Sequence, residues 1–293
     1  MNSIIGIDEV AAFSDAHSVY PLIDPEPLFA AQAFKGQVVL VTGASRGIGL
    51  STALFYARAG ADLLLVSRKR DTLEATKAEV QQAVPNARIE LFEADVAHPS
   101  AGADAVKKAV DVFGKLDVLV ANAGIPGAGM NCLVAEKDPI IWWHTQEVNV
   151  RGVFVFIHAA LPELVKTKGQ IVITSSGVAH LRIPQWSEYC LSKHTINRLA
   201  ELVSLEYPDV KIYPVHPGVV ATQLAEESGA PIPTVDPPEL MAATATWLTA
   251  RNAEFLSGRY VSAAWDLNEV LAKKDEIVRE NLLVTKLATP SKA

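Results

Sequence analysis

Cysteine is nearly absent from this chain of 293 residues, which contains only Cys132 and Cys190. Two cysteines cannot build the framework of bridges that stabilises small secreted domains, so that class of protein is excluded. So few cysteines in a chain of this length are typical of a reducing compartment, and we expect an intracellular, cytoplasmic protein. Residues 1–20 include Asp8 and Asp15 and no basic segment, so we expect neither a secretory signal nor a transit peptide.

Positive charge and long apolar runs are also scarce. Lys and Arg total 26 against 33 Asp and Glu, a net charge of −7, and no long basic run appears. We therefore expect no surface for nucleic acid. No uncharged apolar run approaches the roughly 18 residues of a membrane-spanning helix, so we expect none. An apolar fraction of 49% and a charged fraction of 20% exclude a disordered or fibrous chain.

The chain does contain a regular alternation of short apolar runs and amphipathic stretches. We expect strands at 38–41, 63–66, 89–92, 116–120, 171–173, 210–215 and 260–261. Apolar residues spaced at i, i+3, i+4 and i+7 predict helices between them, for instance at about 150–165 and 238–250. Asp71 and Glu74 resemble a capping box that would start another helix. Strands without internal alternation, separated by helices, predict an α/β fold: a single doubly wound parallel sheet, or Rossmann domain, with helices on both faces.

The two ends of the chain lie outside this alternation. We expect the domain at 36–262, an N-terminal extension at 1–35 and a C-terminal tail at 263–293. The extension shows no periodicity, and two alternatives stay open: it packs over the domain, or it is partly disordered. The tail mixes Leu and Val with Lys and Glu over 267–287, which suits an amphipathic helix on a partner subunit or a cover over the pocket.

A glycine-rich turn follows the first expected strand and precedes a helix. Its residues are Thr42, Gly43, Ala44, Ser45, Arg46, Gly47, Ile48 and Gly49. Glycine lets the backbone approach a pyrophosphate closely, and the N-terminus of the following helix offers free N–H groups. A plain turn is the alternative, but the strand before and the helix after favour dinucleotide binding.

A tyrosine and a lysine stand four residues apart at the start of an expected helix. Tyr189 and Lys193 therefore share one helix face. A phenol has an unperturbed pKa of about 10, and a nearby ammonium lowers this pKa, so the pair makes a usable acid and base. Ser176 follows the fifth expected strand, at the edge where such sheets bind ligands. Its hydroxyl is placed to hold a substrate carbonyl beside the tyrosine.

Together these motifs resemble the compact branch of the short-chain dehydrogenase/reductase family over about residues 36–262. The glycine spacing Gly-x-x-x-Gly-x-Gly is that of the family, and the resemblance assigns catalysis to Ser176, Tyr189, Lys193 and Asn149. The family's Asn-Asn-Ala-Gly segment reads Ala-Asn-Ala-Gly at 121–124 and departs only at its first position. The dinucleotide contacts that the resemblance implies are Thr42, Gly43, Ser45, Arg46, Gly47, Ile48, Gly49, Ser67, Arg68, Asp95, Val96, Asn122, Ala123, Gly124, Tyr189, Lys193, Pro217, Gly218, Val220 and Thr222.

The resemblance implies a reaction without a metal, in which a nicotinamide exchanges hydride with a small carbonyl or alcohol substrate. Tyr189 would donate the proton, Ser176 would hold the carbonyl oxygen, and Lys193 would lower the tyrosine pKa and bind the ribose. Asn149 would help to hold a water. A non-catalytic NADP-binding sensor is the alternative, but such relatives typically lose the tyrosine or the lysine. An epimerase or dehydratase would have a larger C-terminal part. A homodimer or homotetramer is implied by analogy.

Basic residues follow the second expected strand, where folds that prefer NAD usually place an acidic side chain for the ribose 2′-hydroxyl. Residues 67–70 read Ser-Arg-Lys-Arg, and Arg46 lies in the glycine turn. Arginine suits bidentate phosphate contacts, so we expect NADP(H). Solvated surface charges are the alternative.

Several other side chains are weighed and given no reactive role. His180, His194 and His216 lack metal-ligand spacing, and Cys190 lacks the partners of a thiol nucleophile. Trp142 and Trp143 are expected in a pocket wall or in packing, and Trp247 in the core. By family analogy the pocket edges are 124–132, Trp186 and a lid at 221–237.

Overall fold

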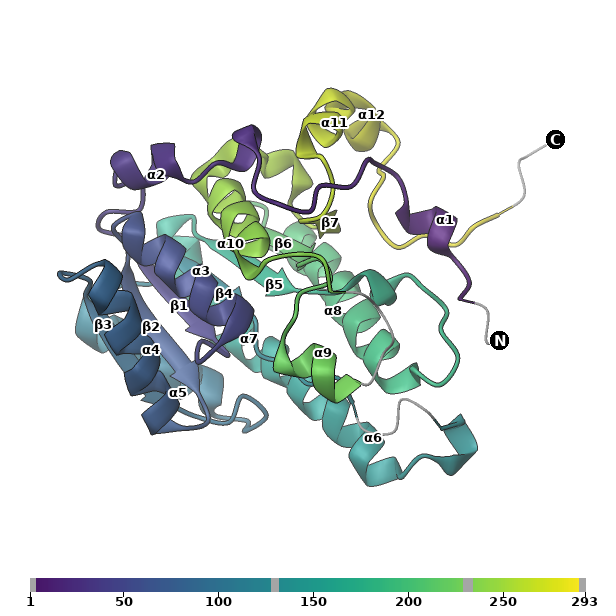
Figure 1. Ribbon diagram of the computed structural model, residues 1–293, viewed down its shortest axis with the longest axis horizontal. Coiled ribbons are helices and arrows are strands. Elements are labelled where there is room, and N and C mark those ends of the chain that lie inside the picture. Colours follow the sequence, from purple (N-terminus) through teal and green to yellow (C-terminus); the bar gives the residue numbers. More distant parts are fainter. Residues whose placement is uncertain (1–3, 128–131, 229–233, 290–293) are drawn as a thin grey trace.

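The computed structural model describes residues 4–127, 132–228 and 234–289 (Figure 1). These residues contain one sheet of seven parallel strands in the order β3-β2-β1-β4-β5-β6-β7. The strands are β1 (Val38–Thr42), β2 (Asp62–Ser67), β3 (Ile89–Glu93), β4 (Val118–Ala121), β5 (Gln170–Thr174), β6 (Lys211–His216) and β7 (Val261–Ser262). The expected doubly wound α/β fold is confirmed.

Helices cover both faces of the sheet. One face packs against α3 (Gly47–Arg58), α4 (Arg70–Ala83) and α10 (Pro238–Trp247), and the other against α5 (Ala101–Phe113), α7 (Gly152–Thr167) and α8 (Ser187–Glu206). All five residues of β1 are buried, and Val39 and Val41 face one core cluster while Val38 and Leu40 face the other. The strand order reverses between β1 and β4, which opens a ligand crevice at their carboxyl ends.

The helix expected from about residue 150 begins earlier. Asp138 accepts hydrogen bonds from the backbone of Ile140 and Ile141 and caps α6 (Pro139–Gln146), which continues through a π-helical turn (Glu147–Arg151) into α7. An aspartate followed by proline is the signal for this start that the periodicity missed. The combined helix, 139–167, is long and apolar enough to cross a membrane by length and composition, but half of its most apolar window is buried within the protein.

The expected capping box of α4 is not formed. The helix starts at Arg70, and no side chain caps its first turn. Glu74 instead accepts a hydrogen bond of 2.8 Å from Nε of Arg70. Because the helix begins before Asp71, this aspartate lies inside the first turn and not at the N-cap position.

The extension contacts the domain at several points along residues 4–35 and is buried mainly in its second half. It contains α1 (Ile7–Val10) and α2 (Glu26–Ala30), and the side chains of Phe29 and Phe34 are buried. The Phe34 ring lies 5.0 Å from the ring of Tyr56 in α3. Aromatic packing of this kind removes a large apolar area from water, so the packed alternative is correct for the described part of the extension.

The tail differs from the single amphipathic helix that its composition suggested. It forms two short helices, α11 (Leu267–Ala272) and α12 (Lys274–Arg279), and then turns back onto its own domain. The backbone N–H of Tyr260 donates to the carbonyl of Leu283, 2.8 Å away, and Ile277 is buried. Apolar contact with the domain therefore decides the course of the tail.

Candidate active site

The glycine turn between β1 and α3 has a backbone that only glycine fits. Gly43 has a φ of +65°, and a Cβ there would lie 2.9 Å from Cα of Ala123. A Cβ on Gly49 would lie 2.2 Å from the carbonyl oxygen of Gly43. The turn thus stays open toward the crevice and exposes the N-terminus of α3, an arrangement that fits a dinucleotide pyrophosphate.

Thr42 and Asn122 cross-link the ends of three strands. Oγ1 of Thr42 accepts the backbone N–H groups of Asn122 (3.0 Å) and Ala123 (3.1 Å). The Asn122 amide donates to the carbonyl of Gly43 at 3.3 Å and accepts from the hydroxyl of Thr174 at 3.0 Å. These polar groups are bound within the protein, so both side chains hold the crevice in shape.

Asn149 sits in the π-helical turn before α7 and is completely buried. Its amide donates to the carbonyl of Ile125 (2.9 Å) and to the hydroxyl of Ser192 (3.1 Å), and its oxygen accepts the N–H of Ile125. A Cβ on Gly124 would lie 3.2 Å from Oδ1 of Asn149 and 3.6 Å from Nζ of Lys193. π-helical turns of this kind often mark functional sites.

Ser176, Tyr189 and Lys193 meet at the carboxyl edge of the sheet. Ser176 follows β5, and its hydroxyl hydrogen-bonds to the hydroxyl of Tyr189 in α8. Nζ of Lys193 donates to the carbonyl of Thr174 at 2.7 Å and lies 5.7 Å from the centre of the tyrosine ring. The structure therefore brings together the four side chains that the sequence motifs singled out.

Burial sets the protonation of this pair. It raises the pKa of Tyr189 to about 12, against the smaller opposite effect of the hydrogen bond with Ser176. It lowers the pKa of Lys193 to about 8. The sequence predicted that Lys193 would lower the tyrosine pKa, but the pKa is raised. Desolvation dominates, and the ammonium of Lys193 donates to the carbonyl of Thr174. Tyr189 is therefore a protonated donor near neutral pH.

The basic residues expected at the ribose lie where the turns after β1 and β2 meet. The N–H of Ala44 donates to the carbonyl of Val66 at 3.2 Å, which joins the two turns. Arg46 and Arg68 are exposed, and the structure shows no hydrogen bond or ion pair from either guanidinium group to a described residue. Arg70, in contrast, is bound to Glu74. Two guanidinium groups are thus available to a ligand at this end of the crevice.

The other expected dinucleotide contacts line the same edge. Oδ1 of Asp95 accepts the N–H of Ala97 at 2.9 Å, and Val96 packs beside Gly152. A Cβ on Gly47 would lie 3.4 Å from Cγ2 of Thr222, so the turn after β6 reaches the glycine turn. Other expected contacts lie on the glycine turn, at the end of β2 and on the turn after β6. They are Ser45, Ile48, Ser67, Pro217, Gly218 and Val220.

The residues given no reactive role have contacts within the protein. His194 bonds to the carbonyl of Ala179, and His180 to the amide of Asn197. Among the described residues no cluster of His, Cys, Asp and Glu could hold a metal. Burial raises the pKa of the Cys190 thiol to about 11, so it stays protonated.

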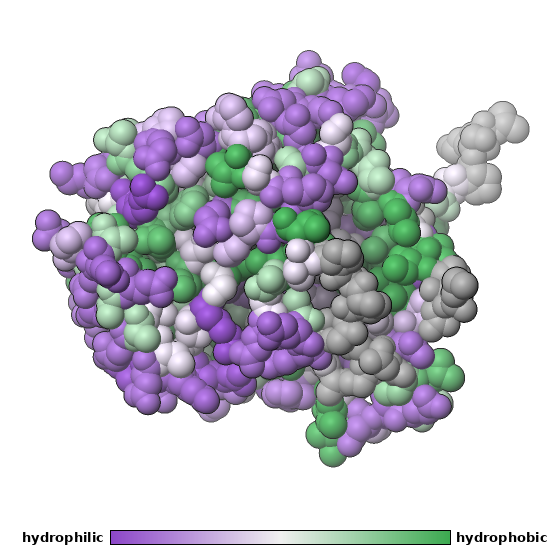
Figure 2. Space-filling view, viewed as in Figure 1, coloured by the Kyte–Doolittle hydropathy of each residue, from purple (hydrophilic) through white to green (hydrophobic). Residues whose placement is uncertain are grey.

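The tryptophans divide between packing and surface. Nε1 of Trp142 donates to the hydroxyl of Ser187 at 3.0 Å, whereas Trp143 is 60% exposed. Exposed apolar side chains are visible at the lower edge of the molecule in Figure 2. Trp247 is buried, and the ring of Trp186 lies 6.4 Å from that of Tyr189. Of the expected pocket edges, residues 128–131 and 229–233 lie outside the described chain.

Sequence patterns did not predict a buried ion pair at the start of α8. Nζ of Lys137 lies 2.9 and 3.0 Å from the carboxylate oxygens of Glu188, and both side chains are almost fully buried. Gly127 packs so closely that a Cβ would lie 2.7 Å from Cγ of the glutamate. The partners are 51 residues apart, and no local motif announces such a contact.

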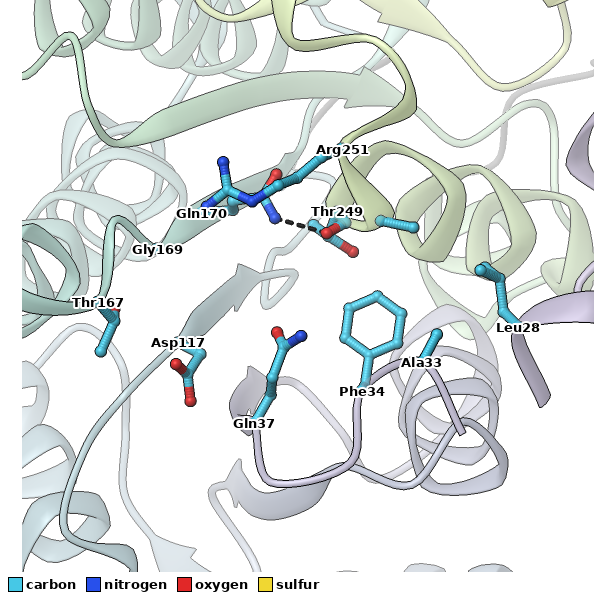
Figure 3. Close-up of a pocket in the computed structure, with 11 residues that line it drawn as sticks. Leu28, Ala33, Phe34, Gln37, Asp117, Thr167, Gly169, Gln170, Thr249 and Arg251 are labelled. Carbon is cyan, nitrogen blue, oxygen red and sulfur yellow. Dashed lines mark hydrogen bonds between the residues drawn. The ribbon is translucent and has the colours of Figure 1, made fainter. Parts of the chain in front are cut away.

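A cavity of about 400 Å³ lies at the opposite end of the sheet (Figure 3). It is bordered by Phe34, Gln37, Asp117, Gln170 and Arg251, near the amino ends of β1, β4 and β5. The amide of Gln170 donates to the carbonyl of Thr249 across it. Because the catalytic side chains stand at the carboxyl ends, this cavity is not the active site.

Comparisons with known proteins agree with this geometry. Residues 37–232 match the family model described as short chain dehydrogenase. The chain is 38% identical over 264 residues to short chain dehydrogenase mpl6 of Monascus purpureus, covering 86% of this chain and 89% of that relative.

Two solved structures carry the same fold with a cofactor bound. An alcohol dehydrogenase from the archaeon Thermococcus sibiricus, complexed with 5-hydroxy-NADP, has a TM-score of 0.69 at 29% identity and covers 77% of this chain and 95% of its own. An NAD+-bound xylitol dehydrogenase has a TM-score of 0.71 at 26% identity and covers 79% and 99%. On its fold, its glycine turn and these likenesses, the chain belongs to the short-chain dehydrogenase/reductase family, whose oxidoreductases use a nicotinamide cofactor.

Proposed function

We propose that this protein is an NADP(H)-dependent oxidoreductase that interconverts a ketone or aldehyde with an alcohol. The observation that carries the proposal is the buried group of Ser176, Tyr189 and Lys193 beside the glycine turn. The hydroxyls of Ser176 and Tyr189 are placed to hold one carbonyl oxygen between them. The protonated phenol can then donate its proton to that oxygen.

The chain's own residues supply orientation and the proton. When bound, the nicotinamide supplies the hydride in reduction and accepts it in oxidation. Oγ of Ser176 donates a hydrogen bond to the substrate oxygen, and Tyr189 transfers its proton to that oxygen as the alcohol forms. The ammonium of Lys193 stabilises the resulting phenolate, and Asn149 holds the turn at Ile125 and helps to keep a water for reprotonation.

A panel of carbonyl compounds tests the activity. We expect oxidation of NADPH, followed by absorbance, with at least one ketone, quinone or aldehyde. Tyr189→Phe should bind NADPH as the parent does and lose nearly all turnover, because the ring stays and only the proton donor goes. A variant that keeps substantial activity would remove Tyr189 as the donor. NADPH binding without turnover across the panel would favour the non-catalytic sensor.

The choice of NADP(H) is supported by the free guanidinium groups of Arg46 and Arg68. A charged hydrogen bond to phosphate contributes about 1.5–3 kcal/mol, or roughly 10- to 100-fold in affinity. We expect Arg68→Glu to lower kcat/KM for NADPH by about this factor and to leave NADH nearly unchanged. Arg279→Glu, the same charge change on the exposed surface of α12, is the control. Equal or better efficiency of the parent protein with NADH would contradict the choice.

We also propose a homodimer or homotetramer in the cytoplasm. Apolar side chains on the outer sides of α7 and α8 support the assembly: Phe154 is 48% exposed and Leu205 is 78% exposed. Apolar patches of this kind are typical of interfaces. Neither Cys132 nor Cys190 forms a disulfide with a described residue, which suits a reducing compartment.

A further inference from the structure

The N-terminal extension reaches the catalytic edge through one ionisable contact. Nδ1 of His17 lies 2.7 Å from Oδ1 of Asp236. The carboxylate side chain is only 1% exposed, whereas the histidine is 52% exposed. His17 lies in the extension and Asp236 just beyond the segment 37–232 that matches the family model, so the contact joins the extension to the end of the matched segment.

Asp236 in turn holds the turn after β6. Its Oδ2 accepts the backbone N–H of Val219 at 2.6 Å, and the carbonyl of Val219 accepts the backbone N–H groups of Val235 and Asp236. Gly218 has a φ of +88°, and a Cβ there would lie 2.5 Å from Oδ2 of Asp236. The carboxylate is thus packed directly against the backbone of a turn that the family resemblance places beside the nicotinamide.

Other contacts hold the extension at this place. The N–H of Ala16 donates to the carbonyl of Ala264 at 2.6 Å, and the ring of Phe13 lies 4.9 Å from that of Trp265. Ser14 binds Glu269 of α11. In Figure 1 the purple segment accordingly passes beside β7 and the yellow helices before it reaches α2. His17 is therefore positioned by backbone and packing contacts of its neighbours with the segment that follows β7.

His17 is the side chain that hydrogen-bonds to the buried carboxylate of Asp236 from the extension. The other ionisable groups near this pair are His216 and Asp15. Burial lowers the pKa of His216 to about 4, so it is neutral, while the hydrogen bond with Asp236 raises the pKa of His17. A buried carboxylate needs such hydrogen-bonded partners, because an uncompensated one is costly.

We propose that His17 is a positioning residue: by donating to Asp236 it fixes the turn at Pro217–Val220 that receives the nicotinamide half of the cofactor. The inference rests on the proposed function in that it takes the ligand to be a nicotinamide dinucleotide. The extension is then a part of the cofactor site and not only a cover of the domain.

Two ligands, one with and one without the nicotinamide, distinguish an effect on the nicotinamide site from a general loss of stability. We expect His17→Ala to raise the Kd of NADPH by up to about tenfold, the limit if the whole free energy of a hydrogen bond to a charged group acts on the cofactor site. The Kd of 2′-phospho-ADP-ribose, which lacks the nicotinamide, should change less than twofold. His17→Asn keeps an N–H donor and should restore most of the affinity. Ser14→Ala removes a different contact of the same segment and should leave both constants unchanged.

Amide exchange gives a readout that needs no ligand. The N–H of Val219 is bound to Asp236, so its hydrogen exchange in the free protein should accelerate severalfold in His17→Ala and not in Ser14→Ala. Equal weakening of both ligands, or unchanged exchange at Val219, would overturn the inference. If the parent protein bound neither ligand, the proposed function would fail, while the exchange experiment would still decide the role of His17.

Discussion

At the scale of single residues, desolvation controls the chemistry of the site. Tyr189 and Lys193 are both buried, and burial moves their pKa values in opposite directions, to about 12 and about 8. A tyrosine with this pKa is protonated throughout the neutral range, which suits reduction. Of the two, Lys193 is the group that changes charge in the mildly alkaline range, near pH 8.

The rate of reduction should therefore report Lys193. Proton donation leaves a phenolate on Tyr189, and the ammonium stabilises this anion only while it is charged. We expect kcat for reduction, measured with NADPH and the fastest substrate of the panel, to be level in acid and to fall as pH rises through about 8. Lys193→Arg keeps its charge at this pH and should lose the decline. A decline that persists unchanged in this variant would contradict the assignment.

At the scale of elements, the catalytic helix is tied to α6 and to the loop before it. Gln146 donates to the carbonyl of Glu188 at 2.8 Å, and Trp142 donates to Ser187. Glu188, which forms the buried ion pair with Lys137, directly precedes Tyr189 in the sequence. These contacts hold the first turn of α8, so the position of the tyrosine depends on two neighbouring segments.

Removing one partner of this pair should be costly. Lys137→Met leaves a buried carboxylate without its cation, and we expect the free energy of unfolding to fall by about 3–5 kcal/mol. Lys137→Met with Glu188→Gln removes both charges and should recover part of the loss. Lys166→Met breaks an exposed pair with Glu163 and should cost about 0–1 kcal/mol. Denaturant unfolding measures all three, and similar losses for Lys137→Met and Lys166→Met would contradict the interpretation.

At the scale of the whole molecule, the extension is part of the core. Phe34 is 1% exposed and packs on Tyr56. We expect Phe34→Ala to lower the free energy of unfolding by about 3–5 kcal/mol through lost burial and the cavity left behind. Leu287→Ala, at a side chain that is 88% exposed, should have almost no effect. A small loss for Phe34→Ala in thermal or denaturant unfolding would show that the extension is only loosely attached.

Much of the fold was readable from local patterns. The strands and the glycine turn appear where apolar runs and glycines predicted them, because both are short and depend on neighbours in the sequence. The start of α6 was missed since its signal, Asp138 before a proline, precedes an irregular apolar pattern. The composition of the tail left its course open, and the structure shows two short helices whose apolar residues Leu267, Val270 and Ile277 pack on the domain.

Motif spacing and periodicity are local properties, so the class of fold and the candidate reactive side chains could be predicted from them. Only the tertiary structure decided the direction of the Tyr189 pKa shift, since burial depends on every element around the phenol. The contacts of Lys137 with Glu188 and of His17 with Asp236 join residues 51 and 219 positions apart. No local pattern encodes such pairs; the packing of the chain brings them together and excludes the water that would otherwise solvate them.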